Sequence, residues 1–491
     1  MSQPVLLHDR AKSLLRTIVV GAGEAGIALA RDLRRVSSFG LDPVGFLDDD
    51  ATKLGRRYGG RRVLGTLAEL EEVLEHNRID VVVVAIPSMP SHEVRELGLR
   101  AAALGATVLH LPPFLSALQR QIAGTDMRAL QVGPLIGRPE MHVVSRNARE
   151  AIAGKRVLVT GAGGSIGSEL CRQVYGFGPE QLIMLDHDES NLHRTQLELW
   201  GEALLDTENT VVADIRDTER IFQLFRDYRP QIVFHAAALK HLPVLERHPC
   251  EGVKSNVRGT QNLVEAAVAH DVERFVLIST DKAANPTSVL GATKRLAELV
   301  LDSQQPASTV LTAVRFGNVL GSRGSLLHVV RDQLASGSPV TVTHPDVSRF
   351  FMTIEEAVGL VLEAVRMSDG SATYVLDMGE PVRIVDLIHN FANLLNIREV
   401  DFKYTGLRPG EKLHEELFGA GEEALPTDHP RISMTRPPRA AAGFRAGLRE
   451  LYDSAGHNRP DEVCRHLRRL VPEYTPAPGL VSAGAPYPDD Y

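Results

Sequence analysis

The stretch KRVLVTGAGGSIGSEL, residues 155–170, runs from an apolar, β-branched segment through a glycine-rich turn into a helical pattern. Gly161, Gly164 and Gly167 follow VLVT at the spacing GxxGxxG. Glycines at such a turn let backbone N–H groups approach a pyrophosphate, and the N-terminus of the following helix favours its negative charge. The stretch therefore predicts the strand, turn and helix of a dinucleotide-binding fold.

A second turn of this kind lies near the N-terminus. RTIVVGAGEAG, residues 16–26, again places glycines between a strand pattern and a helix pattern, and VGFLDDD, residues 44–50, ends the next apolar strand in acids. Short apolar runs at 81–88 and 106–113 extend this pattern. Two such fingerprints, each between a strand and a helix, predict an α/β protein with two Rossmann-like, doubly wound parallel sheets. No acid-base cluster follows the first turn, so nucleotide binding and a structural or oligomer-forming role are equal alternatives for that domain.

After residue 170, apolar runs alternate with helical segments, at 181–188, 210–217, 231–238, 274–281 and 309–318. This alternation predicts parallel strands joined by right-handed crossovers, whose functional groups lie at the carboxyl ends of the strands. The residues at these ends are Asp186, Asp214, Ala237, Ala238, Thr280, Asp281, Lys282 and Asn318.

We expect four segments along the chain. Residues 1–145 form the N-terminal Rossmann-like domain, and residues 150–435 form the catalytic domain, with a substrate lobe mainly after residue 320. Residues 436–474 form a helical extension. Residues 475–491, rich in proline, glycine and alanine, form a flexible tail.

The composition is that of an ordinary globular protein, with 43% hydrophobic and 24% charged residues and a formal charge of −8, which gives no reason to expect a nucleic acid partner. Cys171, Cys250 and Cys464 form no CxxC pair, so we expect neither a disulfide framework nor a metal site. The N-terminus lacks the pattern of a secretory signal, and no apolar run reads as a membrane span. These features predict the cytoplasm, at the inner face of the membrane if an anchoring segment is missing from this chain.

Several motifs occur in a fixed order: TGAGGSIGSE, LDHDE, ADIRD, HAAALKHLPVLE, STDKAANPTSVLGATK, VRFGNVLGSRGS, THPDVSRFFMT and GLRPGEKLHEEL. From about Lys155 to Ile432 the chain resembles the extended short-chain dehydrogenase/reductases, and among them the polysaccharide-biosynthesis 4,6-dehydratases of UDP-N-acetylglucosamine. The first domain is similar to the extra domain of the long, membrane-bound members. Those members carry transmembrane helices before this domain, and this chain begins almost directly at it.

The resemblance implies an enzyme that oxidises C4 of the sugar, eliminates water across C5 and C6, and returns the hydride to C6, with a UDP-sugar as substrate and a homo-oligomeric assembly. The catalytic residues it implies are Thr280, Asp281, Lys282 and Lys294. The cofactor-binding residues are Gly161, Gly164, Ser165, Ile166, Gly167, Asp186, Asp214, Ile215, Ala237, Ala238 and Lys294. The substrate-binding residues are Lys240, Asn318, Arg323 and Arg408. Asp186 favours NAD, because a carboxylate repels a 2′-phosphate, and NADP is the alternative.

One departure affects the mechanism. The catalytic tyrosine of the superfamily would lie four residues before Lys294, where this chain has Leu290 and long dehydratases often have methionine. We therefore expect Asp281 to take the C4 hydroxyl proton, directly or through Thr280 or a water, and later to protonate the leaving C6 hydroxyl. We expect Lys282 to remove the C5 proton, with its pKa lowered by burial and by Lys294. Lys294 would mainly bind the nicotinamide ribose.

Structural alternatives accompany these roles. Thr280 to Lys282 could be a helix cap with a solvated charge pair. Lys240 and His241 could be surface residues, and Asn256 could either cap a helix or hold the backbone of the active site.

The remaining alternatives concern charged residues later in the chain. Asn318 and Arg323 could be turn residues, Arg408 and Glu411 could form a surface ion pair, and Arg349 could pair with Asp346. At the level of function, the alternatives are a 4-epimerase of the same fold and a nucleotide-sugar-binding scaffold that has lost its chemistry.

Overall fold

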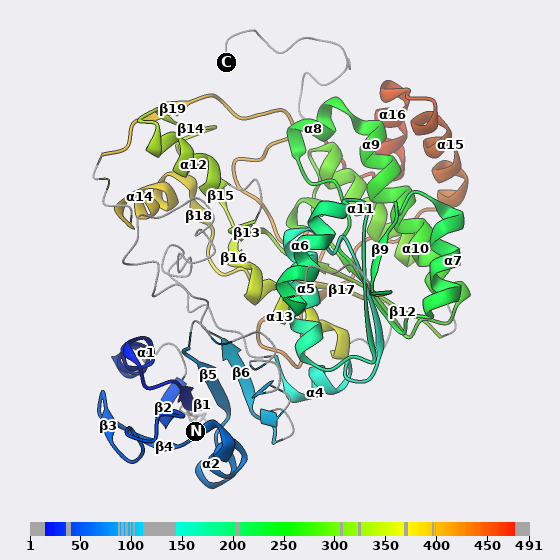
Figure 1. Cartoon of the computed structure of the whole chain (residues 1–491). Helices are drawn as coiled ribbons and strands as arrows, with labels where there is room; N and C mark the ends of the chain where they lie inside the picture. Colours follow the sequence, from blue (N-terminus) through cyan, green and yellow to red (C-terminus); the bar gives the residue numbers. More distant parts are fainter. Residues whose placement is uncertain are drawn as a thin grey trace, which may run out of the picture. The chain divides into compact units, whose positions relative to one another are not determined.

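A computed structural model describes residues 15–35, 41–86, 144–201, 207–304, 308–322, 326–367, 372–394, 397 and 399–476, with short pieces between residues 89 and 110. The chain divides into two compact units. The first comprises Met1–Gln131 and Pro139–Val143, and the second comprises Val132–Arg138 and Val144–Tyr491 (Figure 1). The four segments expected from the sequence stay a prediction, and Arg323 and residues 477–491 lie outside the described residues.

The first unit contains, in its described part, a six-stranded sheet in the order β3-β4-β2-β1-β5-β6. All pairs are parallel except β3 with β4, and the chain order reverses between β1 and β5, as in a doubly wound fold. Ile18 and Val20 lie in one core cluster and Val19 in another, so both faces of β1 are buried. The elements are β1 Leu15–Val20, α1 Glu24–Arg35, β2 Leu41–Leu47, β3 Arg57–Tyr58, β4 Arg61–Gly65, α2 Leu70–Asn77, β5 Val81–Val84 and β6 Thr107–His110.

The second unit contains, among its described residues, a nine-stranded sheet in the order β20-β21-β17-β12-β11-β10-β7-β8-β9. The strands from β17 to β9 are parallel, and β21 and β20 extend the sheet in antiparallel fashion. The chain order reverses between β7 and β10, where doubly wound folds bind their ligands. The expected fold class is confirmed.

The elements of the second unit's first half are α4 Arg146–Glu150, β7 Arg156–Thr160, α5 Ser165–Gly176, β8 Gln181–Asp186, α6 Glu189–Trp200, β9 Thr210–Val212, α7 Thr218–Tyr228, β10 Ile232–His235, α8 Leu242–Arg247, α9 Pro249–Gly252, a π-helical segment Val253–Gly259, α10 Thr260–Ala269, β11 Arg274–Ile278 and α11 Val289–Asp302. Those of its second half are β12 Val310–Arg315, β13 Asn318–Leu320, α12 Leu326–Ala335, β14 Val340–Val342, β15 Ser348–Arg349, β16 Phe351–Thr353, α13 Ile354–Met367, β17 Ala372–Leu376, β18 Val382–Arg383, α14 Ile384–Leu394, β19 Phe402–Tyr404, β20 Leu425–Pro426, β21 Ile432–Thr435, α15 Phe444–Gly456 and α16 Pro460–Leu470.

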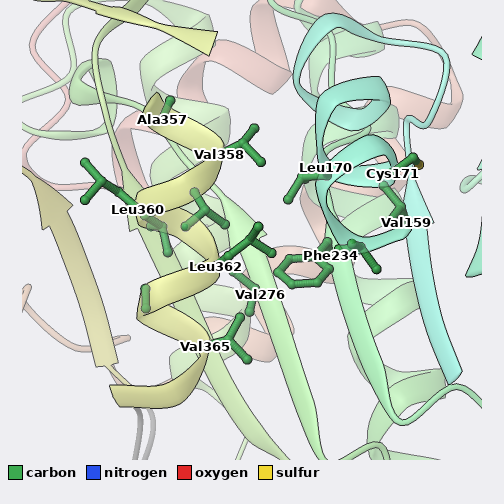
Figure 2. Close-up of a cluster of buried hydrophobic side chains, with 14 of the residues drawn as sticks. Val159, Leu170, Cys171, Phe234, Val276, Ala357, Val358, Leu360, Leu362 and Val365 are labelled. Atoms are coloured by element: carbon green, nitrogen blue, oxygen red, sulfur yellow. The ribbon is translucent and has the colours of Figure 1, made fainter. Parts of the chain in front are cut away.

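Helices cover both faces of this sheet because its strands are apolar on both sides. Val157 and Val159 of β7 pack in the cluster that includes α5 and α13, whereas Leu158 between them packs in the cluster that includes α7 and α10. Figure 2 shows the first cluster, in which Phe234 and Val276 of the sheet lie beneath α5 and α13. Parallel strands with two buried faces hold their carboxyl ends at one edge, which positions the site.

The region after residue 320 contributes both to the large sheet and to smaller sheets. β17 is a strand of the large sheet, and α13 packs on the face of that sheet. The short pairs β13–β16, β14–β19 and β15–β18 form separate two-stranded sheets. At the end of the chain, α15 and α16 pack against α11 and the π-helical segment, in a cluster that contains Leu290 and Tyr474. The N–H of Thr475 donates to the carbonyl of Pro286 (2.9 Å), in the loop before α11.

The glycine turn between β7 and α5 is closed by direct backbone contact. Gly161 has φ +69°, and a Cβ there would lie 2.7 Å from the backbone nitrogen of Ala237. A Cβ on Gly167 would lie 2.0 Å from the carbonyl oxygen of Gly161, whereas one on Gly176, at the other end of α5, would meet nothing within 4 Å. The turn therefore tolerates no side chain at these two positions.

We predict that Gly167→Ala destabilises the protein by about 1–3 kcal/mol, because the new methyl group forces the turn apart. Gly176→Ala in the same helix is the matched control and should stabilise by about 0.4–1 kcal/mol. Urea unfolding of both variants measures the difference. Equal unfolding midpoints for the two variants would contradict the close contact at the turn.

Candidate active site

Asp186, the last residue of β8, is hydrogen bonded to the glycine turn. The buried Asp186 accepts the N–H of Gly163 at Oδ2 (2.8 Å) and the N–H of Asp188 at Oδ1 (3.0 Å). Its carboxylate is thus fixed beside the turn, where a dinucleotide fold places the acid that binds ribose hydroxyls. His187 Nδ1 lies 3.2 Å from Asp186 Oδ1.

The other expected cofactor residues gather along the same edge of the sheet. Asp214 is exposed after β9 and accepts the N–H of Arg216 (2.9 Å), while Ile215 is buried and its carbonyl accepts Asn262 Nδ2 (2.9 Å). Ala237 and the exposed Ala238 follow β10, next to the glycine turn.

This arrangement fits a dinucleotide. α5 begins at Ser165 and Ile166 without a side-chain cap at Gly164, and the backbone around Gly161 leaves no room for a Cβ. Such a cradle offers N–H groups and a helix N-terminus to a pyrophosphate. The individual contacts of these residues with a cofactor stay predictions.

Thr280, Asp281 and Lys282 follow β11 after Ser279 and form one hydrogen-bonded cluster. Asp281 is fully buried, and its Oδ1 accepts the Thr280 hydroxyl (2.9 Å) and the Lys282 ammonium (3.0 Å). Its other oxygen, Oδ2, is buried and has no hydrogen-bond partner among the described residues. Thr280 also accepts the N–H of Lys282 (3.4 Å) and so caps the short helical turn Asp281–Ala283. The capping contact considered as an alternative is therefore present together with the side-chain cluster.

The expected lowering of the Lys282 pKa is wrong. Burial alone lowers the pKa of this ammonium, but the Asp281 and Glu415 carboxylates outweigh burial and raise the pKa above its ordinary value of 10.5. Lys282 Nζ lies 3.0 Å from Asp281 Oδ1, 3.6 Å from Glu415 Oε1, and donates to Asn318 Oδ1 (3.2 Å). The ammonium thus has three oxygen neighbours, and Glu415 was not considered in the sequence analysis.

Lys294 is the lysine whose pKa is lowered. Burial lowers it to about 8, and Glu298 on the same helix opposes this only in part. Its Nζ donates to the carbonyl of Ile278 at the end of β11 (2.6 Å). One turn earlier, Leu290 is 6% exposed and packs in the apolar cluster with α15 and α16, so this position supplies packing and carries no proton.

Beneath the cluster lies a buried ionic network. Glu298 of α11 accepts the Ser279 hydroxyl (2.7 Å) and two N–H groups of Arg315 of β12 (2.7 Å each). Burial alone raises the pKa of Glu298, but Arg315 and Arg295 outweigh it and lower that pKa to about 2. The network ties the helix of Lys294 to the strand end of Thr280, and the sequence analysis did not identify it.

Asn256 holds the backbone of the segment that carries Lys240. Its Oδ1 accepts the N–H of Leu239 (2.8 Å), and its Nδ2 donates to the carbonyl of Leu239 (3.1 Å) and to Thr293 Oγ1 (3.1 Å). Of the two alternatives for Asn256, these contacts favour the one in which it fixes backbone. Lys240 itself is exposed.

Arg349 forms its ion pairs with Glu411 and Glu415, and not with Asp346, the partner considered for it from the sequence. Its Nη2 donates to Glu411 (2.7 Å) and its Nε lies 3.9 Å from Glu415, whereas Asp346 lies 3.6 Å from Arg383. Glu411 therefore pairs with Arg349, and it meets Arg408 through the backbone of that residue: the Arg408 N–H donates to the Glu411 carboxylate (3.2 Å), and the Glu411 N–H donates to the Arg408 carbonyl (3.0 Å). Glu411 and Glu415 lie in the motif GLRPGEKLHEEL, and Arg349 lies in THPDVSRFFMT. The motifs mark these residues, but only the tertiary fold shows which acid pairs with which cation. The substrate-binding roles of Lys240, Asn318 and Arg408 stay predictions.

Fold and site define an extended short-chain dehydrogenase/reductase. A family model described as "Polysaccharide biosynthesis protein" matches residues 157–437, and one described as "CoA-binding domain" matches residues 3–112. The chain belongs to the polysaccharide biosynthesis protein family, as its motifs predicted.

Individual relatives agree with this assignment. The probable polysaccharide biosynthesis protein EpsC of Bacillus subtilis (strain 168) is 41% identical over 425 residues, which cover 85% of this chain and 71% of EpsC. The UDP-N-acetylglucosamine 4,6-dehydratase (inverting) of Campylobacter jejuni (strain 81-176) is 31% identical over 278 residues, 55% of this chain and 80% of that enzyme. The X-ray structure of Pen from Bacillus thuringiensis is 32% identical, with a TM-score of 0.53 over 58% of this chain and 90% of that chain.

Two expectations concern the surroundings of the protein. None of the helices in the described ranges combines the length and the hydropathy that a bilayer span requires. The expected homo-oligomer stays a prediction.

We predict that Glu298→Gln destabilises the protein by about 3–5 kcal/mol near neutral pH, because the buried Arg315 and Arg295 lose the carboxylate that they share, and Glu422 then pairs with Arg315 alone. The Glu298 pKa is lowered from 4.5 to about 2, so the stability that its charge contributes is present above pH 4.5 and is lost as the pH falls through that range. The difference between wild type and variant should therefore shrink on acidification. Urea unfolding near pH 7 and near pH 3 measures it.

Glu180→Gln is the matched control, since Glu180 is 55% exposed and pairs with Arg156 at the surface (3.1 Å). Its effect should stay within about 1 kcal/mol at either pH. A Glu298 variant that behaves like this control would show that the buried network contributes little.

Proposed function

We propose that the protein is an NAD-dependent 4,6-dehydratase of a UDP-N-acetylhexosamine, most simply UDP-N-acetylglucosamine, which it converts to the 4-keto-6-deoxy sugar for polysaccharide biosynthesis. The observation that carries the proposal is the hydrogen-bonded Thr280–Asp281–Lys282 cluster, in which the buried Asp281 accepts the half-buried Thr280 hydroxyl and Lys282 ammonium. The similarity to a UDP-N-acetylglucosamine 4,6-dehydratase supports this substrate class. A bound nicotinamide would supply a reversible hydride acceptor at this site.

In this proposal Asp281 replaces the missing phenol as the first proton carrier. Because Asp281 is fully buried, the proton of the C4 hydroxyl reaches it through the half-buried Thr280 hydroxyl, which donates to Oδ1 and takes up the sugar proton in turn. The protonated Asp281 then donates by the same path to the C6 hydroxyl, which leaves as water. Leu290 excludes water from the helix face before Lys294 and takes no part in proton transfer.

The raised pKa of Lys282 fits this order of events. In the resting state, burial is outweighed by Asp281 and Glu415, so Lys282 is an ammonium. Once Asp281 has taken the C4 proton it is neutral, so only Glu415 still favours the charged amine against burial, and the pKa of Lys282 falls relative to the resting state. Lys282 can then release a proton to solvent water, remove the C5 proton made acidic by the C4 ketone, and later return it.

The function is tested by incubating the protein with NAD and UDP-N-acetylglucosamine in deuterated water. We expect a product that has lost one water by mass spectrometry and that carries deuterium at C5 by NMR, because the C5 proton exchanges on Lys282. An isomer of unchanged mass would overturn the proposal in favour of a 4-epimerase. Thermal stabilisation by the sugar nucleotide without any conversion would favour a binding scaffold.

We predict that Asp281→Asn lowers kcat by about 10²- to 10⁴-fold, because an amide cannot carry the C4 proton. The KM for the sugar nucleotide should change little, since the amide has the same size. Steady-state kinetics measures both values. Asp227→Asn, at a 47% exposed carboxylate beside Arg226, is the control and should leave both unchanged. Retention of wild-type kcat in Asp281→Asn would show that another group carries this proton.

A further inference from the structure

Glu415 is a buried acid that the proposed mechanism does not use. It is 7% exposed, its Oε1 lies 3.6 Å from Lys282 Nζ and 3.9 Å from Arg349 Nε, and its Oε2 is buried with no hydrogen-bond partner among the described residues. The site therefore holds two carboxylates, Asp281 and Glu415, on either side of one ammonium. Each of them keeps one desolvated oxygen.

These acids belong to a longer row of alternating charges. From the end of β11 the row runs from Asp281 to Lys282, to Glu415, to Arg349 of β15 and to Glu411, with adjacent charged atoms 2.7–3.9 Å apart. Glu411 also accepts the backbone N–H of Arg408 (3.2 Å). The row thus connects the end of β11 with the loop that carries Arg408, which the resemblance implies as a substrate-binding residue.

A purely structural ion pair explains this arrangement poorly. At 3.6 Å and 3.9 Å, the contacts of Glu415 with Lys282 and Arg349 are too long for good hydrogen bonds, so Glu415 contributes mainly its charge. A desolvated carboxylate with a free oxygen opposes folding unless other interactions offset it. Such local conflicts concentrate at functional sites.

We propose that Glu415 is a positioning residue of the active site, whose charge holds the Lys282 ammonium in line with Asp281 and Asn318 and connects it to the Arg408 loop. The proposal rests on the proposed dehydration, because it concerns the step in which Lys282 removes the C5 proton. The preceding oxidation at C4 uses Asp281 and Thr280 and needs no base at Lys282. Loss of Glu415 should therefore affect the second step and spare the first.

The neighbouring glutamate provides a matched control. Glu416 is 54% exposed at its side chain and accepts Asn285 Nδ2 and Lys412 Nζ, both at 3.0 Å, so it lies in the same segment but faces away from Lys282. Glu416→Gln removes the same charge from the same loop without touching the row. Glu415→Asp keeps the charge on a shorter side chain and serves as a rescue variant.

The first experiment follows single turnovers of the full chain with NAD and UDP-N-acetylglucosamine. In Glu415→Gln we expect reduced nicotinamide, seen by its ultraviolet absorbance, to form at the wild-type rate and then to accumulate. Incorporation of deuterium at C5 should slow by about 100-fold, the effect of a displaced catalytic group. KM should stay within about twofold, Glu415→Asp should recover part of the rate, and Glu416→Gln should match wild type. Equal slowing of both steps in Glu415→Gln would overturn the proposal.

A second measurement tests whether Glu415 holds Lys282 even if the wild-type protein does not dehydrate the sugar. It therefore separates failure of this proposal from failure of the proposed function. Thermal unfolding of Lys282→Met, Glu415→Gln and the double variant forms a double-mutant cycle. We expect the double variant to lose clearly less stability than the sum of the two single losses, because each single change already removes the interaction between Lys282 and Glu415. Additive losses would show that Glu415 does not hold Lys282, whatever the reaction.

Discussion

The ion pair between Glu298 and Arg315 is the constraint on which the geometry of the site depends. Both side chains are almost fully buried, and each charge is balanced there by the other together with one further partner, Glu422 for Arg315 and Arg295 for Glu298. Glu298 lies on the helix that also carries Lys294, Arg315 lies on β12, and Ser279 joins them from the end of β11. One desolvated contact thereby sets the distance between three elements that supply the chemistry.

Much of the fold was readable from the sequence, because glycine turns and apolar strands report local geometry. The two glycine fingerprints, the strand ends and the loss of a phenol at Leu290 all concern residues that are near one another in the chain. The charge state of Lys282 was not readable in this way, since it depends on Glu415, which only the tertiary fold brings to it. The same reason explains why Arg349 was assigned Asp346 as its alternative partner, when its partner is Glu411.

In both units, an aspartate accepts a backbone N–H of the first glycine turn. In the first unit Asp48 accepts the N–H of Ala22 (2.7 Å), as Asp186 accepts that of Gly163 (2.8 Å) in the second. In the first unit, however, Lys53 also binds the same carboxylate oxygen (3.0 Å). A shared turn therefore does not carry a shared ligand preference, because an acid already paired with an amine presents a different surface to a ribose.

The contact of Thr475 with Pro286 ties the last described residues to the loop before α11. Tyr474, buried beside it, packs in the same apolar cluster as the first turn of that helix. A deletion that removed Tyr474 and Thr475 would therefore take away both the packing and the hydrogen bond that hold the loop before α11, although these two residues are far from that loop in the sequence.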